Sequence, residues 1–287
     1  MKKTALRLLA SAGVLALAAC SATRVVYGNA DTVMSFMASS YLDLDSGQSE
    51  DLRPLIVRFH QWHRANELPV YAALLQSASQ RAAKGITAED VSWGLGNLRA
   101  RYRRLAAKAV EDAAPVLATL APAQLAALED TFAGKNEKYA KEFLPADEKK
   151  RRRAQGKRML ERLRDFAGEL TPEQEARIGR FVAAHERHVA LRFEDRRRWQ
   201  REFVALLKQH REPGELGRQL AEMFTRPEAR RSEEFLREDR RWDEDFAQLI
   251  VDLDRSLSPV QRAHVVRRLS DYAEDCTVLA GRKAEAA

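Results

Sequence analysis

The chain has 287 residues, of which 32% are charged and 7% are aromatic, and its formal net charge is +7 at pH 7. This length allows one large or two small domains, and the low aromatic content favours a thin, elongated core. The chain has two cysteines, Cys20 and Cys276. If Cys20 carries lipid, an intramolecular disulfide is excluded even in an oxidising compartment.

The first 19 residues have the proportions of a secretory signal peptide. Three cations precede the uncharged run "LLASAGVLALAA" (8–19), which is too short to span a bilayer because a transmembrane helix needs about 20 apolar residues. The run ends in "LAAC" (17–20), which resembles the lipobox of bacterial lipoproteins. In that class the cysteine receives a diacylglyceryl group and becomes the N-terminus after cleavage.

The lipobox resemblance implies a signal peptide at 1–19 and a periplasmic domain at 20–287, anchored through Cys20. Ser21 stands where an aspartate usually retains lipoproteins in the inner membrane, so it favours the inner leaflet of the outer membrane. One acyl chain such as palmitate holds a protein only marginally, and two or more hold it firmly. Cleavage also removes three cations, which lowers the formal net charge from +7 to +4.

Apolar residues recur about every 3.6 residues along most of the chain, and the alternating pattern of strands is nearly absent. We therefore predict an all-α protein, an elongated bundle with several long amphipathic helices. It forms one domain or two helical halves, about 20–169 and 170–287. The longest stripe predicts a single helix from Thr171 to about Gln209, roughly 60 Å long at 1.5 Å per residue.

Several predicted helices start with related sequences. In "TPEQ" Thr171 is the N-cap and Gln174 lies at the third helical position, which makes a capping box around a proline at the first position. Related sequences occur at Ser258–Gln261, at Asp45–Gln48 without the proline, and at Ala121–Gln124 without a capping oxygen. Helix initiation alone explains these repeats.

The same residues carry a first resemblance to a known family. Leu170, Thr171 and Gln174 match the Leu-Thr-x-x-Gln motif of small periplasmic chaperones and stress sensors, which are cradle-shaped all-α dimers that bind unfolding clients. The resemblance implies a client-binding surface on the predicted long helix, where apolar and basic residues alternate. Its tentative binding residues are Phe193, Arg197, Trp199 and Arg201.

A second resemblance covers most of the chain. "YGNADTVMSFMASSYLDLDSGQ" (27–48) and "WHRANELPVYAALL" (62–75) follow the lipobox. Together they resemble an uncharacterised family of bacterial lipoproteins of the DUF6279 type, with an aromatic-Asn-x-Asp stretch and a Trp-His-Arg…Leu-Pro-x-Tyr stretch as recurring marks. The marks fall on Tyr27, Asn29, Asp31, Trp62, His63, Arg64, Leu68, Pro69 and Tyr71. Trp62, His63, Arg64 and Tyr71 are further tentative binding residues, and the family implies no known activity.

A metal-dependent hydrolase is the alternative function. His60, His63 and Glu67 are spaced for one helical face, and three such groups can hold Zn²⁺ with an open coordination position. Pro69 makes a continuous helix at Glu67 doubtful, and histidines that pack beside Trp62 explain the same pattern. His-Glu-x-x-His, Gly-x-Ser-x-Gly and Walker motifs are absent from the sequence.

Basic runs such as "KKRRR" (149–153) invite a nucleic-acid hypothesis. A periplasmic protein meets little DNA or RNA, however, and acidic residues three or four positions away favour a solvated helix face. We therefore predict no nucleic-acid partner, no cofactor and no catalytic residue. The predicted function is a non-enzymatic binding or envelope-maintenance role, chaperone-like in one version. Its partners are outer-membrane lipid through the acyl anchor and unfolded or envelope proteins, and the oligomeric state is left open.

Overall fold

The computed structural model describes residues 24–281, and this part of the chain is all-α, which confirms the predicted fold class. The helices are α2 (Ala30–Leu42), α3 (Ser46–Asn66), α4 (Leu68–Lys84), α5 (Ala88–Leu117), α6 (Pro122–Phe143), α7 (Glu148–Ala167), α8 (Pro172–Ala184), α9 (Glu186–Gln209), α10 (Pro213–Thr225), α11 (Glu233–Arg255) and α12 (Pro259–Gly281). Cys20 and the predicted signal peptide lie outside the described residues. Between residues 24 and 281 no helix is long and apolar enough to cross a membrane.

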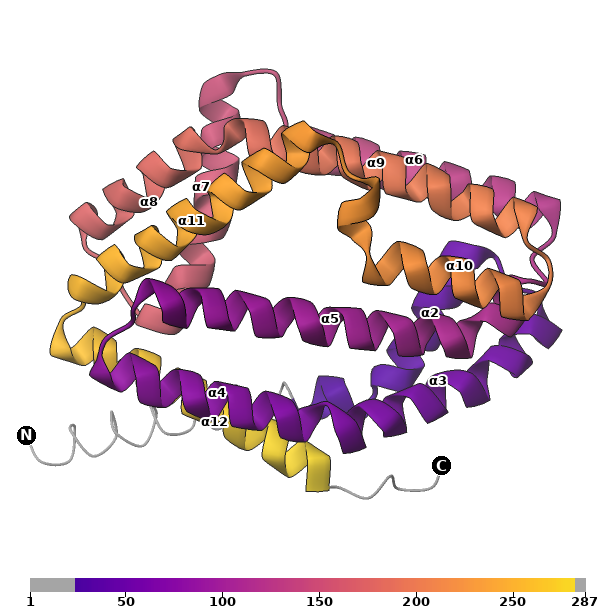
Figure 1. The fold of residues 1–287 in the computed structure, drawn as a ribbon, viewed down its shortest axis with the longest axis horizontal. Coiled ribbons are helices and arrows are strands. Elements are labelled where there is room, and N and C mark those ends of the chain that lie inside the picture. Colours follow the sequence, from indigo (N-terminus) through magenta and orange to yellow (C-terminus); the bar gives the residue numbers. More distant parts are fainter. Residues whose placement is uncertain (1–23, 282–287) are drawn as a thin grey trace, which may run out of the picture.

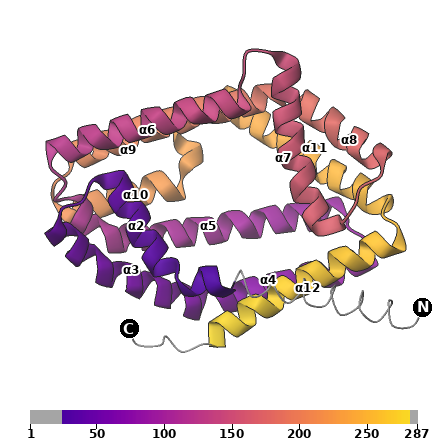
Figure 2. The same ribbon diagram turned by 180° about the vertical axis from the view of Figure 1, so that it is seen from behind.

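The helices form a closed frame around a central space (Figure 1). α5 runs through the middle of the molecule, with α4 and α12 along one side and α8, α11, α9 and α6 along the other. α12 packs along α4, α10 along α5, and α9 along α6. The view from behind shows α7 crossing one end of the frame and α10 near the other (Figure 2). Helices that are distant in the sequence therefore face each other across the interior.

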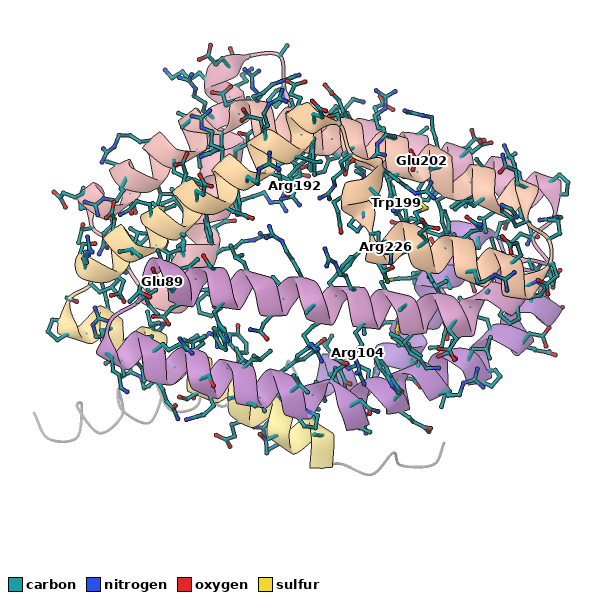
Figure 3. The ribbon with its side chains drawn as sticks, viewed as in Figure 1. Glu89, Arg104, Arg192, Trp199, Glu202 and Arg226 are labelled. Carbon is teal, nitrogen blue, oxygen red and sulfur yellow. The ribbon has the colours of Figure 1, made fainter. Side chains whose placement is uncertain are left out.

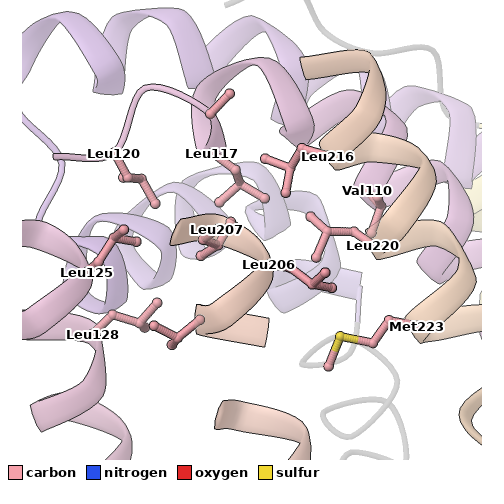
Figure 4. Packing of buried hydrophobic residues seen from close by; sticks show 12 residues of the cluster. Val110, Leu117, Leu120, Leu125, Leu128, Leu206, Leu207, Leu216, Leu220 and Met223 are labelled. Atoms are coloured by element: carbon pink, nitrogen blue, oxygen red, sulfur yellow. The ribbon is translucent and has the colours of Figure 1, made fainter. Parts of the chain in front are cut away.

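Two hydrophobic clusters hold this frame together. The first joins α5, α6, α9 and α10, and Leu207 and Leu216 are fully buried in it (Figure 4). The second joins α8 to α11 through Ile178 and Leu249. Leu125 and Leu216 belong to the same first cluster although they lie on either side of the possible division at 169/170. The larger cluster is therefore shared by both parts of the sequence.

The predicted capping sequences all begin helices. Thr171 Oγ1 accepts a hydrogen bond from the backbone N–H of Gln174, and Gln174 Oε1 accepts one from the N–H of Thr171 at 2.9 Å. Ser258 with Gln261, and Asp45 with Gln48, form the same reciprocal pair. Ala121 offers no side-chain acceptor, and only the Gln124 half of the box is present, at 2.8 Å.

The predicted single helix from Thr171 to Gln209 is wrong, because the chain turns at His185 between α8 and α9. His185 has φ −116° and ψ 20°, and its N–H bonds to the carbonyl of Val182, one residue short of the α-helical partner. Neither proline nor glycine stands at the break. The His185 ring is buried 4.5 Å from the ring of Phe181 and close to Asp245 of α11. Tertiary packing of this kind overrides the small propensity differences that favour a continuous helix.

Candidate functional site

A cavity of about 1130 Å³ occupies the space inside the frame. Helices α4 to α9, α11 and α12 all contribute residues to its wall, which is mostly apolar and includes Leu95, Leu163 and Leu269. Leu98 and Phe166 line the cavity and are also exposed to solvent, so the cavity opens to the outside near them. Ligand pockets usually measure roughly 300–1,000 Å³, and this cavity is therefore large enough for a ligand with a long apolar part.

Aromatic rings form two groups in the cavity wall. On α11, Trp242 and Phe246 stack with centroids 4.7 Å apart, and Phe181 of α8 meets Trp242 edge to face at 5.8 Å. On the α6 and α9 side, Tyr139 and Phe193 stack at 5.6 Å. Trp242 and Phe246 are four residues apart, so a helix carries them on one face. Stacked rings of this size offer a large apolar contact area to a ligand.

The two acidic residues of the cavity wall are both neutralised by arginine. The Asp90 carboxylate accepts hydrogen bonds from the backbone N–H of Thr87, the N-cap of α5, and from Arg81. These hydrogen bonds hold the pKa of Asp90 below its usual value. Asp254 pairs with Arg262, whose Nη1 lies 2.9 Å from Oδ1. Neither carboxylate therefore remains available to a cationic ligand.

Four further arginines line the cavity and have no acidic partner in the described part of the chain: Arg158, Arg162, Arg192 and Arg196. Arg192 projects from α9 beside the central space (Figure 3). Arg196 donates to the uncharged Asn136 at 2.9 Å, and Arg158 lies over the ring of Phe143 at 4.2 Å. All four side chains are exposed to solvent. Because a guanidinium stays protonated at physiological pH, the rim of the cavity is positively charged.

Two histidines of the cavity wall lie beside carboxylates of α11. His188 Nε2 lies 3.0 Å from Asp239 Oδ1, and the ring is stacked on Trp242 at 5.6 Å. The hydrogen bond from His188 lowers the pKa of Asp239. His185 Nε2 lies 3.1 Å from Asp245 Oδ2, and burial lowers the pKa of its ring. Each histidine thus lies beside its own aspartate of α11, but only His188 makes a hydrogen bond there, and both ring nitrogens of the buried His185 are without one within the described residues.

The motif residues before α2, in α3 and in α4 meet in a second cluster. Tyr27 Oη lies 2.7 Å from His63 Nδ1, and the Tyr27 ring contacts His60 at 4.8 Å. Tyr71 meets His63 edge to face at 5.5 Å, and the Arg64 guanidinium lies 5.7 Å from the Tyr27 ring. Burial raises the pKa of Tyr27 to about 12 and lowers the pKa of His63 to about 4. Both side chains are therefore neutral at pH 7.

Glu67 lies apart from the two histidines with which the sequence groups it. It is fully buried at the junction of α3 and α4, and its carboxylate faces α5, with Oε1 2.8 Å from Arg104 Nε and Oε2 3.6 Å from Arg101 Nη1. Arg104 also covers the ring of Trp62 at 5.6 Å. Among residues 24–281, no group of three histidine, cysteine, aspartate or glutamate side chains could hold a metal ion.

The tentative binding residues of α9 separate in the structure. Phe193 lines the cavity, and the Arg197 guanidinium lies 6.0 Å from its ring. Trp199 instead stacks on Phe203 at 5.3 Å and packs against the first hydrophobic cluster, so it is not an open surface (Figure 3). Arg201 is exposed and lies outside the cavity wall.

Four residues of the cavity wall were not predicted from the sequence to form one site: Arg158, Arg162, Arg192 and Trp242. Trp242 belongs to an apolar stripe, and such a stripe looks the same whether it faces a packed core or a cavity. The arginines belong to basic helix faces, and the sequence pattern predicts that such faces lie in solvent. Arg158 and Arg162 each have an acidic residue three positions further on, Glu161 and Asp165, so no sequence signal separates them from a solvated helix face.

The family to which the chain belongs follows from comparison with known proteins. No curated protein and no solved structure matches the chain. A family model described as a family of unknown function, DUF6279, matches residues 40–236. The matched segment is more than half of the chain and contains all of α3 to α10, including the stretch from Trp62 to Tyr71 and most of the cavity wall. The chain therefore belongs to the DUF6279 family.

Proposed function

We propose that this protein is a lipid-anchored periplasmic binding protein, without enzymatic activity, whose central cavity holds the apolar part of a ligand. The observation that carries the proposal is the cavity of about 1130 Å³ with its aromatic and aliphatic wall. The lipobox sequence ending at Cys20 supports the anchoring and the compartment. Fold and site together favour holding a molecule over transforming one.

The apolar side chains that face the cavity favour the binding of an apolar ligand. In small engineered voids, each Å³ of residual cavity costs about 24 cal/mol because the lining loses its packing partners. A ligand with a matching apolar surface restores those contacts, and each buried methylene contributes about 0.8 kcal/mol. Trp242 and Phe246 in particular present stacked ring faces that a ligand chain can cover. Ligand binding thereby stabilises the frame.

The chaperone version of the proposal has weaker support than a cavity ligand. Trp199 and Phe203 pack on Phe224 inside the protein, with the rings of Trp199 and Phe224 5.0 Å apart. They offer little to an unfolding client, and Phe193 faces the cavity. The hydrolase version would require His60 and His63 to share a ligand with Glu67, which is engaged with Arg104.

Photo-crosslinking in intact cells tests the proposed function. A photoreactive phenylalanine analogue replaces Phe246, which lines the cavity, in the full chain. The same analogue at Val260, which is 75% exposed on α12 and lies outside the cavity wall, measures background. We expect small-molecule adducts at position 246 and none at 260. Polypeptide adducts at 246 would favour the chaperone version, and equal adducts at both positions would contradict a cavity site.

A further inference from the structure

We infer that the ligand of the cavity is an anionic lipid, with its acyl chain against the apolar wall and its acidic head group at the arginine rim. The inference rests on the proposed function, because it names the chemical class of the ligand for the same site. The arginine rim is defined as Arg158, Arg162, Arg192 and Arg196. The site thus combines an apolar interior with an exposed, positively charged rim.

The positions of the arginines suit a head group that stays near water. Arg158 and Arg162 are one turn apart on α7, and Arg192 and Arg196 are one turn apart on α9, so each pair lies on one helix face. All four line the cavity and remain exposed, whereas Phe181 and Val182 on the same wall are buried. A guanidinium donates hydrogen bonds in a fork that matches the oxygens of phosphate and carboxylate.

The charge balance of the wall selects against other amphiphiles. Asp90 and Asp254 are occupied by Arg81 and Arg262, so a cationic head group would find arginines and no free carboxylate. A neutral amphiphile would leave the arginine charges uncompensated. A free phosphate ion would use the rim and none of the aromatic wall formed by Trp242 and Phe246. The anionic lipid is the class that uses both parts.

Reconstituted vesicles test the head-group preference. The full lipidated chain, with the photoreactive analogue at Phe246, is inserted into vesicles that contain phosphatidylcholine and phosphatidylglycerol in equal amounts. Adducts are identified by mass after irradiation. We expect phosphatidylglycerol to exceed phosphatidylcholine among the adducts by at least about fivefold, since a single nearby arginine favours an anionic lipid by about that factor. The variants Arg162→Gln and Arg192→Gln should bring the ratio toward one. Arg180→Gln removes an exposed charge of α8 outside the cavity wall and should keep the preference.

The outcomes separate this inference from the function on which it rests. Adducts at position 246 with no head-group preference would overturn the anionic lipid and keep the binding function. No adducts above the background of position 260 would overturn both. A preference that survives both arginine variants would overturn the role of the rim. An adduct to the acyl chain on the protein's own Cys20 would overturn the inference, because the anchor would then occupy the cavity.

A different observation assigns a membrane-facing surface to α2 and the residues before it. We define the α2 stripe as Val25, Val26, Val33, Phe36 and Met37, large apolar side chains that are all exposed, with Phe36 at 74%. Within α2, at 3.6 residues per turn, Val33, Phe36 and Met37 fall within an arc of about 100°, and Val25 and Val26 precede the N-cap residue Asn29. The opposite side of this segment packs on α3 and α6. We propose that the stripe lies in the surface of the bilayer that holds the anchor.

The distance to the anchor supports this surface. Val25 follows Cys20 by five positions, and a fully extended chain over that interval spans at most roughly 18 Å. The stripe itself contains no charged residue, and the nearest cation, Arg24, is paired with Asp275 of α12. An apolar face held this close to acyl chains is expected to insert among lipid head groups, as amphipathic interfacial helices do.

The same vesicles test the stripe. The photoreactive analogue at Phe36 is expected to form lipid adducts in the proportions of the vesicle, well above position 260. Replacing Val26 and Val33 with aspartate should reduce these adducts, and replacing the exposed Glu50 of α3 with glutamine should not. Adducts no more frequent than at 260 would overturn the surface. In cells, crosslinks from Phe36 to a second copy or to another protein would overturn it as well.

Discussion

Gln174 and Gln261 hydrogen-bond to each other through their side-chain amides, with Nε2 of Gln261 2.9 Å from Oε1 of Gln174 and the reciprocal pair at 3.3 Å. Each Oε1 also accepts the backbone N–H of its own N-cap residue, Thr171 or Ser258. Each Nε2 also donates to a carbonyl of the opposite turn, that of Ser256 or of Glu169. Each glutamine amide therefore caps its own helix, α8 or α12, and also connects that helix to the turn before the other one.

The same device recurs at α3 and α6. Gln48 and Gln124 donate to each other at 3.2 and 2.6 Å, and they also donate to the carbonyls of Thr119 and Asp43. Glutamate would cap these helices equally well, but it has no N–H to donate across the turn. The repeated glutamine of the four helix starts thus has a tertiary role besides the local one.

We expect Gln174→Glu to destabilise the protein, because the variant keeps the acceptor for Thr171 and loses the donor to Ser256. Gln174 is 2% exposed and Gln261 is 8% exposed, so the variant also removes the donor to the buried Oε1 of Gln261, and a buried polar group that loses its partner costs about 1–3 kcal/mol. Urea unfolding followed by circular dichroism measures the free energy of unfolding. Gln76→Glu, exposed on α4, serves as the control. Additive losses in Gln174→Ala and Gln261→Ala would show that the two amides are not coupled.

Thr171→Ala should lower the free energy of unfolding by about 0.5–2 kcal/mol, because Thr171 Oγ1 satisfies the N–H of Gln174. Ala121→Ser should raise it by a smaller amount. Ala121 already has extended N-cap backbone, with φ −70° and ψ 157°, and lacks only the oxygen. Thermal and urea unfolding of the two variants are the measurements. An unchanged Thr171→Ala protein would mean that water replaces the cap without loss.

The stability of the protein should fall between about pH 6.5 and pH 4 because of His63. Burial lowers the pKa of His63 to about 4, so in this window the unfolded chain binds a proton that the folded chain does not. The contribution is complete above pH 6.5 and decreases as the pH falls, by at most about 1.4 kcal/mol per pH unit. The partial exposure of the ring reduces this slope. His63→Gln should flatten the curve relative to the parent, and parallel curves would show that His63 does not titrate in this way.

Addition of zinc should leave the melting temperature unchanged, because Glu67 is engaged with Arg101 and Arg104 and does not meet His60 and His63. A metal that binds only the folded state would raise it. Metal analysis of protein purified without chelators is the companion measurement. Stoichiometric zinc that disappears in both His60→Ala and His63→Ala would revive the hydrolase alternative.

Cys20→Ala should abolish lipidation and leave the chain unprocessed or released from the outer membrane. Cys276→Ala is the matched control. Its thiol is half-buried in α12, where burial raises the pKa, so it is a poor nucleophile and should be dispensable for anchoring. Palmitate incorporation and membrane fractionation provide the two measurements. Labelled, membrane-bound Cys20→Ala protein would show that the lipobox interpretation is wrong.

Prediction from the sequence succeeded where the signals are local. Thr171, Pro172 and Gln174 specify a helix start through hydrogen bonds that span three residues, and apolar spacing identifies the face that each helix buries. The motif residues Tyr27, His63 and Tyr71 meet in one cluster, and these contacts could not be foreseen because they join three separate segments. Helix termination by His185 could not be foreseen either, because its cause, burial against Phe181 and Asp245, lies in another helix.

The sequence by itself determined the helical class, the helix starts and the family. These depend on backbone hydrogen bonds and spacings that each segment carries within itself. Only the tertiary structure decided that the apolar stripe with Trp242 borders a cavity, while the rings of Trp199 and Phe203 pack into a core. Both stripes have the same periodicity. What they face depends on where distant helices close the frame, and that position results from packing summed over the whole chain.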